Sequence, residues 1–476
     1  MNWILGLPEL VLAVSALVIL AAGVLQKKDE AFLPCAMLSI AAFVVTGFLV
    51  VRAPDGIAYN GMLVVDAFSR FIKVLALIGG VAAIALSIGY SDGRRQLPFE
   101  MPVLVLFSTL GAMVMASSSN LMTLFVGLEL SSLSIYILCA IERDRLGAAE
   151  AGLKYFILGS LASGLLLYGM SLVYGYAGTM DYAPIAAEIN GTGVVPLGLM
   201  IGTVFIIVGL AFKLSAVPFH MWTPDVYQGA PTPVTAYMAG APKFAAFALI
   251  LRVMSGPFGA MSPRWQMLIE VIAALSMLFG SFAAIPQHNI KRLMAYSSIG
   301  HMGYAMMGLA AASPAGTTGT LVYLAAYLVM NAGTFGVIAA MRRRGHEVTG
   351  ISDLAGLGRN NPGLALVLAI CMFSMIGVPP MAGFFGKFMV FAAAWNAGLY
   401  PLVAVGAVSA VVGAFYYLRV VKVIYFDPAA APFDKTAPSV SFVSVAMGLA
   451  TVLFLIGLGP ISTAAQAAAQ ALIGQG

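Results

Sequence analysis

Long apolar runs separated by short polar breaks follow one another along this chain of 476 residues. A helix that crosses a bilayer needs about 20 consecutive apolar residues, and most of these runs reach that length. Their succession predicts fourteen membrane-spanning helices. The predicted spans cover approximately residues 4–25, 31–51, 64–90, 101–117, 120–141, 152–176, 196–217, 233–254, 266–285, 293–311, 318–341, 363–395, 399–424 and 438–459.

The composition supports the same fold class. Hydrophobic residues make up 61% of the chain and charged residues only 9%. A soluble domain carries about 25% charged residues, and disorder requires low hydrophobicity together with high charge. Both classes are therefore excluded, and we predict an all-α polytopic membrane protein embedded in a lipid bilayer.

Basic residues are distributed unevenly among the predicted loops. The loops after odd-numbered spans hold fifteen Lys and Arg residues, whereas the alternate loops and helix ends hold four. Cytoplasmic loops carry an excess of Lys and Arg, so we expect the protein in a bacterial inner membrane with both termini on the periplasmic side. The fifteen are Lys27, Lys28, Arg94, Arg95, Arg143, Arg145, Lys291, Arg292, Arg342, Arg343, Arg344, Arg359, Arg419, Lys422 and Lys435, and the four are Arg52, Arg70, Arg252 and Arg264.

Two spans contain proline at apolar depth. Residues 212–218 read Phe-Lys-Leu-Ser-Ala-Val-Pro, and residues 373–380 read Phe-Ser-Met-Ile-Gly-Val-Pro-Pro. Both contain Phe-x-x-x-small-Val-Pro, and proline breaks the helical hydrogen-bond ladder. We therefore expect broken helices seven and twelve, at Pro218 and at Pro379 and Pro380, although membrane helices also tolerate incidental proline kinks.

The two breaks occupy equivalent positions in two five-span groups that begin on opposite sides of the membrane. Paired broken helices in inverted repeats indicate an ion or substrate path near the middle of the membrane. The predicted organisation is a three-helix segment over 1–100, a first repeat of helices 4–8 over 101–255, a second, inverted repeat of helices 9–13 over 265–425, and a C-terminal helix and tail over 436–476.

Among the charged residues inside the predicted spans we single out five, which are Glu129, Lys154, Lys213, Lys243 and Lys387. A charge at the centre of a bilayer costs roughly 2.5–3.5 kcal/mol. Four basic groups and one acid cannot all pair, and burial favours the neutral forms of Lys and Glu. The excess indicates a proton relay, in which Glu129 and Lys154 are expected to influence each other. The alternatives are fixed counter-ions in the core and, for Lys154, a side chain that reaches the membrane surface.

Two histidines and one aspartate extend this set. His220 follows the break at Pro218, and His301 lies inside span ten. Imidazole titrates near neutral pH, so both are candidates for the relay, His301 less strongly, although a lone buried His is commonly a hydrogen-bonded core residue. Asp225 either caps the following helix fragment, the reading we favour, or pairs with a cation.

Other kinds of chemistry have no candidate residues. Cys35, Cys139 and Cys371 stand singly in apolar stretches, and no metal-binding, haem-binding or dinucleotide-binding motif is present. The dense basic cluster at residues 342–344 lies at a helix end and does not indicate nucleic acid. We expect no redox centre, cofactor or metal in this chain.

Four motifs carry a resemblance to a known family. They are the segment from Phe212 to Ala236 (FKLSAVPFHMWTPDVYQGAPTPVTA), GLELSSL from residue 127, YSSIGHMGY from residue 296 and GFFGKF from residue 383. Together they resemble the N subunits of the proton-pumping NADH–quinone oxidoreductase, respiratory complex I. YQGAPTPV from residue 227 is closer to this branch than to the sister antiporter-like subunits.

The resemblance implies fourteen helices with two inverted five-helix units and broken helices seven and twelve. It also implies that Glu129, Lys154, Lys213, Lys243 and Lys387 are the charged residues of helices five, six, seven, eight and twelve. NADH, FMN, iron–sulfur clusters and quinone would then reside in the whole complex. The expected partners are other membrane subunits, especially a neighbouring antiporter-like subunit and small membrane subunits.

The expected function is proton translocation coupled to electron transfer from NADH to quinone in partner chains. The chain would be part of an enzyme while containing no redox centre. Two alternatives stay open: a subunit of a multi-subunit cation/proton antiporter, and a membrane scaffold that moves nothing.

Overall fold

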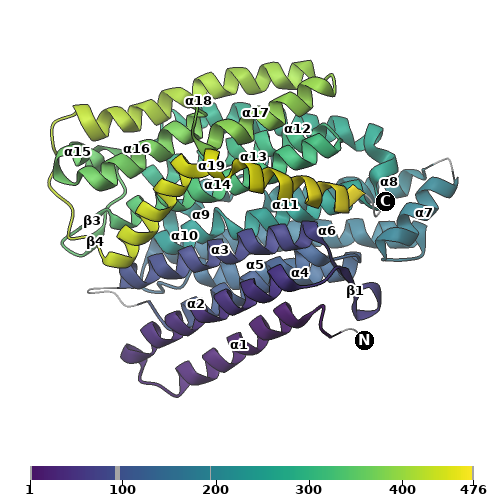
Figure 1. Cartoon of the computed structure of the whole chain (residues 1–476), viewed down its shortest axis with the longest axis horizontal. Coiled ribbons are helices and arrows are strands. Elements are labelled where there is room, and N and C mark those ends of the chain that lie inside the picture. Colours follow the sequence, from purple (N-terminus) through teal and green to yellow (C-terminus); the bar gives the residue numbers. More distant parts are fainter. Residues whose placement is uncertain (1–2, 92–96, 193–194, 474–476) are drawn as a thin grey trace.

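The structure is a computed structural model that describes residues 3–91, 97–192 and 195–473. Helices account for most of these residues, and they run side by side along the long direction of the molecule (Figure 1). This follows from the composition, because only helices satisfy every backbone hydrogen bond within a single apolar segment. Arg94 and Arg95, which entered the count of basic loop residues, lie outside the described residues.

The N-terminal part is a helix hairpin followed by a helix that enters the main bundle. Helix α1 packs against α2, and α3 packs against α2, α4, α11 and α19. A small antiparallel hairpin, in which Gly56 pairs with Val65, joins α2 to α3. The elements are α1 (Leu7–Val24), α2 (Lys28–Arg52), β1 (Gly56–Ala58), η1 (Tyr59–Gly61), β2 (Leu63–Val65) and α3 (Ala67–Ser91).

The next eight helices form the middle of the bundle. The Asn120 side chain accepts hydrogen bonds from the backbone N–H groups of Met122 and Thr123 and so caps α5. Gly178, with φ +69°, ends the long helix α6. The helices are α4 (Glu100–Ser117), α5 (Leu121–Cys139), α6 (Leu146–Ala177), α7 (Tyr182–Thr192), α8 (Leu197–Lys213), α9 (Thr223–Gly229), α10 (Thr232–Met238) and α11 (Ala241–Ser255).

Helix α14 is the centre of the remaining part. It is almost entirely buried and packs against α13, α16, α17 and α19. The elements here are η2 (Gly259–Met261), α12 (Ser262–Ala284), α13 (Ile290–Ala310), α14 (Pro314–Ala340), β3 (Arg342–Arg343), β4 (His346–Glu347), η3 (Ile351–Leu354), α15 (Leu357–Asn360), α16 (Pro362–Ile376), α17 (Ala382–Asn396), α18 (Tyr400–Phe426) and α19 (Pro438–Ile473).

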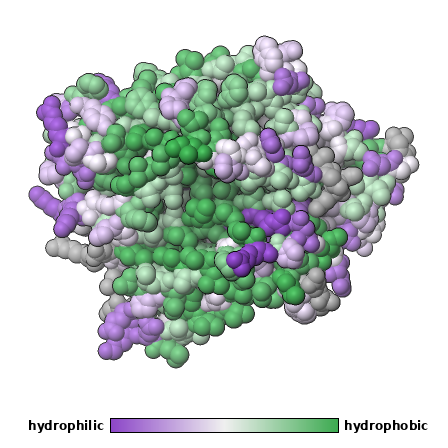
Figure 2. All heavy atoms as spheres, in the orientation of Figure 1, coloured by the Kyte–Doolittle hydropathy of each residue, from purple (hydrophilic) through white to green (hydrophobic). Residues whose placement is uncertain are grey.

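The membrane-embedded, all-helical fold class is confirmed. Within the described residues, 11 helices are long and apolar enough to cross a membrane. Two shorter apolar helices, α8 and α16, belong to the spans that were expected to be broken. The total of fourteen spans stays a prediction. Figure 2 shows a mostly hydrophobic face over the middle of the helices, with hydrophilic residues gathered mainly toward their ends.

The two ends of the bundle differ. The start of α1, the end of α19 and the β1–β2 hairpin lie at one end, and the β3–β4 hairpin lies at the other (Figure 1). At the β3–β4 end, Glu347 accepts hydrogen bonds from Arg145 and Lys291, and Arg342 donates to the carbonyl of Tyr90. These residues come from loops and helix ends after odd-numbered predicted spans, so these predicted loops do meet at one end.

Candidate functional site

Both proline motifs interrupt a helix. Helix α8 ends at Lys213 and α9 begins at Thr223, with Pro218 between them, while Pro379 and Pro380 separate α16 from α17. Each interruption contains a cis peptide bond, Val217–Pro218 and Pro379–Pro380. Because a break frees backbone groups inside the membrane, these groups need other partners. The indole N–H of Trp222 donates to the carbonyl of Phe212 at 3.0 Å.

Lys213 lies at the first break with its amine inside the bundle. Its Nζ donates to Ser132 Oγ at 2.8 Å and to Tyr136 OH at 3.0 Å, both on α5. Only 8% of the residue is exposed. Hydroxyl groups both accept and donate hydrogen bonds, so the amine is connected to groups that can pass a proton onward.

Glu129 lies on the same face of α5 as these two hydroxyls. Its carboxylate accepts a hydrogen bond from Ser163 Oγ on α6 at 2.5 Å, and its charge acts on Lys213. Positions 129, 132 and 136 follow the i, i+3, i+7 spacing of a single helix face. The helix therefore presents an acid and two hydroxyls to the same region.

Lys154 forms no ion pair with Glu129 in the described structure, so the mutual influence that we expected stays a prediction and would act without direct contact. Its amine forms ion pairs with Asp225 at 2.9 Å and with Glu150 at 2.7 Å, and 42% of the side chain is exposed. Ser163, which contacts Glu129, lies nine positions further along α6, about 13 Å at 1.5 Å per residue. Lys154 is the ninth residue of α6, and its place in the relay stays a prediction.

Asp225 also differs from the reading we favoured. Its side chain makes no cap hydrogen bond to α9, and it pairs instead with Lys154 and, at 2.5 Å, with Arg292. One carboxylate therefore joins α6, α9 and α13. It is only 35% exposed, and the two cations lower the pKa of Asp225 despite the opposite effect of burial.

Lys243 is the least exposed of the lysines that we predicted for the relay. It is 1% exposed, and its Nζ donates to Ser298 Oγ on α13 at 2.7 Å. The hydroxyl of Tyr327 on α14 also donates to this Ser298 oxygen, at 2.9 Å. The amine also lies 5.3 Å from the ring centroid of Tyr227, a favourable position for a cation over an aromatic face.

His301 lies one helical turn after Ser298 on α13 and adds further polar contacts. Its Nδ1 lies 2.6 Å from the hydroxyl of Tyr323, and its Nε2 lies 3.0 Å from the hydroxyl of Tyr417. Tyr417 is in turn 2.5 Å from Ser297 Oγ. The imidazole is 3% exposed, so its two nitrogens are connected to hydroxyls on α14 and α18 and not to bulk solvent.

Lys387 lies at the second break, beside a small cavity. Its Nζ donates to the carbonyls of Met375 and Ile376, at 2.9 and 3.0 Å, in the last turn of α16. The cavity, of about 10 Å³, is lined by Lys387, His301 and Tyr417 among others. This volume is about that of one water molecule, so the cavity offers space for a water beside His301 and Lys387.

His220 is the candidate with the fewest polar contacts. It lies between α8 and α9, and its ring packs against Phe279 at a centroid distance of 4.5 Å. The structure brings it close to the first break but does not join it by hydrogen bonds to Lys213 or Lys243.

The polar side chains form two halves, a first around Lys213 and a second around Lys243 and His301, and a gap separates them. The hydrogen bonds of the described residues do not connect Lys213 with Lys243. Aromatic rings lie between them. The ring of Tyr155 stacks on that of Trp222 with a centroid distance of 4.1 Å, and the ring centroids of Trp222 and Tyr227 are 6.4 Å apart. Proton passage across this gap requires water to enter.

The hydroxyl groups are the site residues that we did not predict. Ser132 and Tyr136 stand three and seven positions after Glu129, and Ser297 and Tyr304 stand four before and three after His301. This helical spacing was the available signal. Tyr323 and Tyr417 carry no such signal, because they reach His301 from other helices. In the described part of the chain, no group of three or more His, Cys, Asp or Glu residues comes together to hold a metal.

Comparisons with known proteins agree with this geometry. The family model described as NADH:quinone oxidoreductase/Mrp antiporter, transmembrane, matches residues 118–413. NADH-quinone oxidoreductase subunit N of Gluconacetobacter diazotrophicus is 67% identical over 99% of this chain and 100% of its own length. Subunit N of Rhodospirillum rubrum is 53% identical over 98% of this chain and 97% of its own.

Solved structures with the same fold include a chain of respiratory complex I from Thermus thermophilus with bound aureothin. It is 32% identical, with a TM-score of 0.83, over 97% of this chain and 99% of that chain. A chain of the Mrp complex from Dietzia sp. has a TM-score of 0.88 at 22% identity, over 99% and 98% of the two chains, which shows a shared fold alone. This chain therefore belongs to the NADH:quinone oxidoreductase/Mrp antiporter transmembrane family, in the branch of the NADH-quinone oxidoreductase N subunits.

Proposed function

We propose that this chain is a proton-translocating membrane subunit of an NADH–quinone oxidoreductase. Electron transfer from NADH to quinone takes place in partner subunits, which hold the FMN, the iron–sulfur clusters and the quinone. The observation that carries the proposal is the row of amines at the two helix breaks and between them, where Lys213 and Lys243 are buried and Lys387 is partly buried. Burying such groups is costly, and a scaffold gains nothing from it.

In this proposal, protons move between the lysines through hydroxyls and transient water. The charge of Glu129 favours the ammonium form of Lys213, and loss of that charge releases the proton. Ser132 and Tyr136 contact Lys213 in the first half. In the second half Ser298 and Tyr327 form the hydrogen bonds around Lys243, and His301 lies one turn further along α13, beside the cavity that Lys387 also lines. His220 and Lys154 border the first half, with Lys154 held by Asp225.

We also propose that the two breaks belong to two inverted repeats, over 101–255 and 265–425, between the segment 1–100 and the tail 436–476. Each repeat would then contribute one half of the path. The similar positions of Lys213 at the end of α8 and Lys387 after the end of α16 support this.

The related function of a cation/proton antiporter subunit shares this fold, as the likeness to the Mrp complex indicates. The high identity to named N subunits favours the oxidoreductase. Purification in mild detergent tests this directly: we expect flavin and iron–sulfur subunits to accompany the chain, and their absence would favour the antiporter.

The orientation is part of the proposal. We place the basic β3–β4 end in the bacterial cytoplasm and both termini in the periplasm, because basic loops remain on the cytoplasmic side. Two exposed positions test it, His346 on β4 and Ile57 on β1. In intact cells, an impermeant thiol reagent should label Ile57→Cys but label His346→Cys only after lysis. The natural cysteines are buried and serve as the background, and the reverse pattern would invert the topology.

Substitution of Lys213 tests the transport function. We expect Lys213→Ala and Lys213→Arg both to lower proton pumping by about tenfold or more, because positioned proton-transfer groups contribute at least that much. Arginine keeps the charge but does not release its proton at physiological pH. The measurement is membrane-potential formation and NADH–quinone activity in vesicles, normalised to assembled complex.

The matched control is Lys422→Arg, since the Lys422 side chain is 66% exposed. This variant should pump as the wild type does. If Lys213→Arg pumps fully while Lys213→Ala fails, Lys213 is a fixed counter-ion and the proposed relay is wrong at this position.

A further inference from the structure

A pocket of about 530 Å³ opens beside the β3–β4 hairpin, away from the line of buried charges. Its apolar wall includes Gly89, Ala339 and Val440, from the last turns of α3 and α14 and the first turn of α19. Its polar wall comes from the hairpin and from the segment before α19. The pocket thus lies where apolar helix ends meet charged loops, which is the level of a membrane surface.

The polar wall carries more positive than negative charge. Arg342, Arg344 and Lys435 line the pocket together with one carboxylate, Asp434. The two Asp434 oxygens accept hydrogen bonds from the backbone N–H groups of Arg344 at 3.0 Å and Gly345 at 2.8 Å. These bonds lower the pKa of Asp434, so this carboxylate stays charged but is engaged by the hairpin backbone.

The three cationic side chains have no carboxylate of their own. Among the described residues, none of Arg342, Arg344 and Lys435 forms an ion pair within 4 Å. Arg342 donates instead to the carbonyls of Tyr90 at 2.8 Å and Gly345 at 3.2 Å, and its buried Nε has no hydrogen-bond partner in this described region. Asp434 offsets part of this charge by its attraction to Arg342, but three cations facing one carboxylate leave the pocket with a net positive charge.

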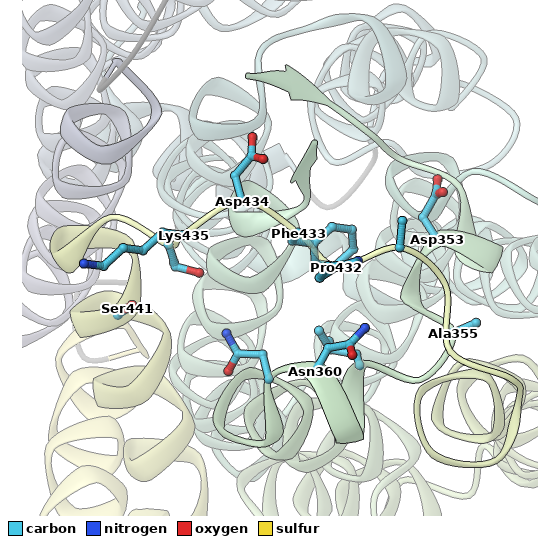
Figure 3. Close-up of a pocket in the computed structure, with 12 residues that line it drawn as sticks. Asp353, Ala355, Asn360, Pro432, Phe433, Asp434, Lys435 and Ser441 are labelled. Atoms are coloured by element: carbon cyan, nitrogen blue, oxygen red, sulfur yellow. The ribbon is translucent and has the colours of Figure 1, made fainter. Parts of the chain in front are cut away.

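The neighbouring pocket, of about 380 Å³, gives a useful contrast. Its basic neighbour Arg343 forms an ion pair with the lining residue Asp353 at 2.6 Å. Figure 3 shows Asp434 pointing toward the hairpin and Lys435 extending to the side opposite Asp353. Asp434 and Lys435 line both pockets, but Arg342 and Arg344 line only the first, so most of the positive charge without an ion pair lies there.

We propose that the pocket lined by Arg342, Arg344 and Lys435 binds the phosphate headgroup of an anionic phospholipid. Basic pockets between membrane helices attract such headgroups, and the N-terminus of α19 adds a favourable dipole. The acyl chains lie along the apolar wall and the hydrophobic face of the helices (Figure 2). A free phosphate shares the headgroup chemistry but makes no use of that wall.

The test uses the assembled complex purified in mild detergent and a photoactivatable phosphatidylglycerol probe. Cross-linked peptides are mapped by mass spectrometry, with unlabelled phosphatidylglycerol, phosphatidylcholine or inorganic phosphate as competitor. We expect labelling around residues 339–345 and 435–440 that phosphatidylglycerol suppresses and phosphatidylcholine does not. Suppression by inorganic phosphate at equal concentration would overturn the lipid assignment in favour of a free-anion site.

A double variant locates the binding. Arg344→Gln with Lys435→Gln should weaken competition by phosphatidylglycerol about 30-fold, given the contribution of each basic residue near an anionic surface. The matched control is Arg359→Gln with Lys422→Gln, which removes the same charge from exposed residues near the β3–β4 end. It should change the competition by phosphatidylglycerol little.

Equal effects of the two double variants, or labelling only elsewhere, would overturn the proposal. The wild-type competition decides the matter even if a variant fails to assemble. Arg344→Lys, which keeps the charge, should retain most of the binding.

Discussion

Lys213 and Lys387 both bury an amine at a helix break, but their partners have different chemistry. Lys213 donates to two hydroxyls, whereas Lys387 donates to two backbone carbonyls of α16. A hydroxyl can accept a proton on one side and donate one on the other, while a carbonyl only accepts hydrogen bonds. Onward transfer from Lys387 therefore depends on water in the adjoining cavity, whereas Lys213 can exchange a proton directly with Ser132 or Tyr136 and needs water only beyond them.

Glu129 offers a test of whether charge or hydrogen bonding controls Lys213. Glu129→Gln removes the charge that acts on Lys213, and Ser163→Ala removes only the hydrogen bond to that carboxylate. We expect the first variant to lower proton pumping about tenfold or more and the second to lower it only slightly. Pumping is measured in vesicles at equal content of assembled complex. Equal loss in both variants would mean that Glu129 acts through its position and not through its charge.

At the scale of elements, the broken helices position the charged side chains. Helix α16 ends at Gly377, where φ is +98° and the backbone N–H donates to the carbonyls of Phe373 and Ser374. The carbonyls of Met375 and Ile376 come next, and no following helical turn supplies N–H groups that could donate to them. The Lys387 amine donates to both carbonyls instead. A cation at the C-terminal end of a helix is also favoured by the helix dipole.

Gly377 is consequently a position where a side chain should be harmful. Gly377→Ala should destabilise the protein by about 1–2 kcal/mol, since L-residues rarely adopt this conformation. The new Cβ would also lie 3.2 Å from the Lys387 side chain, so proton pumping should fall as well. Thermal unfolding and vesicle pumping measure the two effects.

Gly164→Ala is the control for this prediction. Gly164 lies inside α6 and has open space where a Cβ would stand, so alanine there should be neutral or slightly stabilising. A neutral Gly377→Ala variant would contradict the account of this break.

At the scale of the whole molecule, a buried ionic cluster around Glu347 holds separate segments together at the β3–β4 end. Glu347 accepts hydrogen bonds from Thr232, Lys291 and Arg145, which belong to α10, α13 and the loop before α6. Burial alone would raise the pKa of Glu347, but Lys291 and Arg145 outweigh it and hold the pKa at about 2. One carboxylate thus joins segments that are more than 200 residues apart.

This cluster predicts a specific dependence of stability on pH. Because the folded pKa lies below the ordinary value of 4.5, the stabilisation is present above that value and is lost as the pH falls toward 2. The melting temperature of the wild type should therefore fall more steeply over this range than that of Glu347→Gln. At neutral pH the variant should lose about 3–5 kcal/mol, because Lys291 remains buried without its anion, whereas the partly exposed Arg145 keeps its ion pair with Glu142.

Asp427→Asn is the matched control, since the Asp427–Lys422 pair is largely exposed. It should change stability by less than about 1 kcal/mol. Equal losses in the two variants, or parallel pH profiles for Glu347→Gln and the wild type, would contradict a stabilising role of the cluster.

The sequence by itself determined the class of fold and the residues of interest. Apolar runs of sufficient length must form helices in a bilayer, because each segment has to satisfy its own backbone. Pro218 and Pro379 favour an interruption for an equally local reason, but Pro34 and Pro460 lie inside the continuous helices α2 and α19, so proline alone does not decide where a helix breaks. Lys213, Lys243 and Lys387 were evident because a charge in an apolar run is costly wherever the run finally packs.

Only the tertiary structure decided which groups meet. Besides the local partner Glu150, Lys154 pairs with Asp225, 71 positions away, and Glu129 is bonded by Ser163, 34 positions away. Helical spacing shows which side chains share a face, as with Glu129 and Tyr136, but not which helix that face meets or at what depth. Such contacts depend on how separate helices pack, and that packing is set by the shapes of many apolar side chains together.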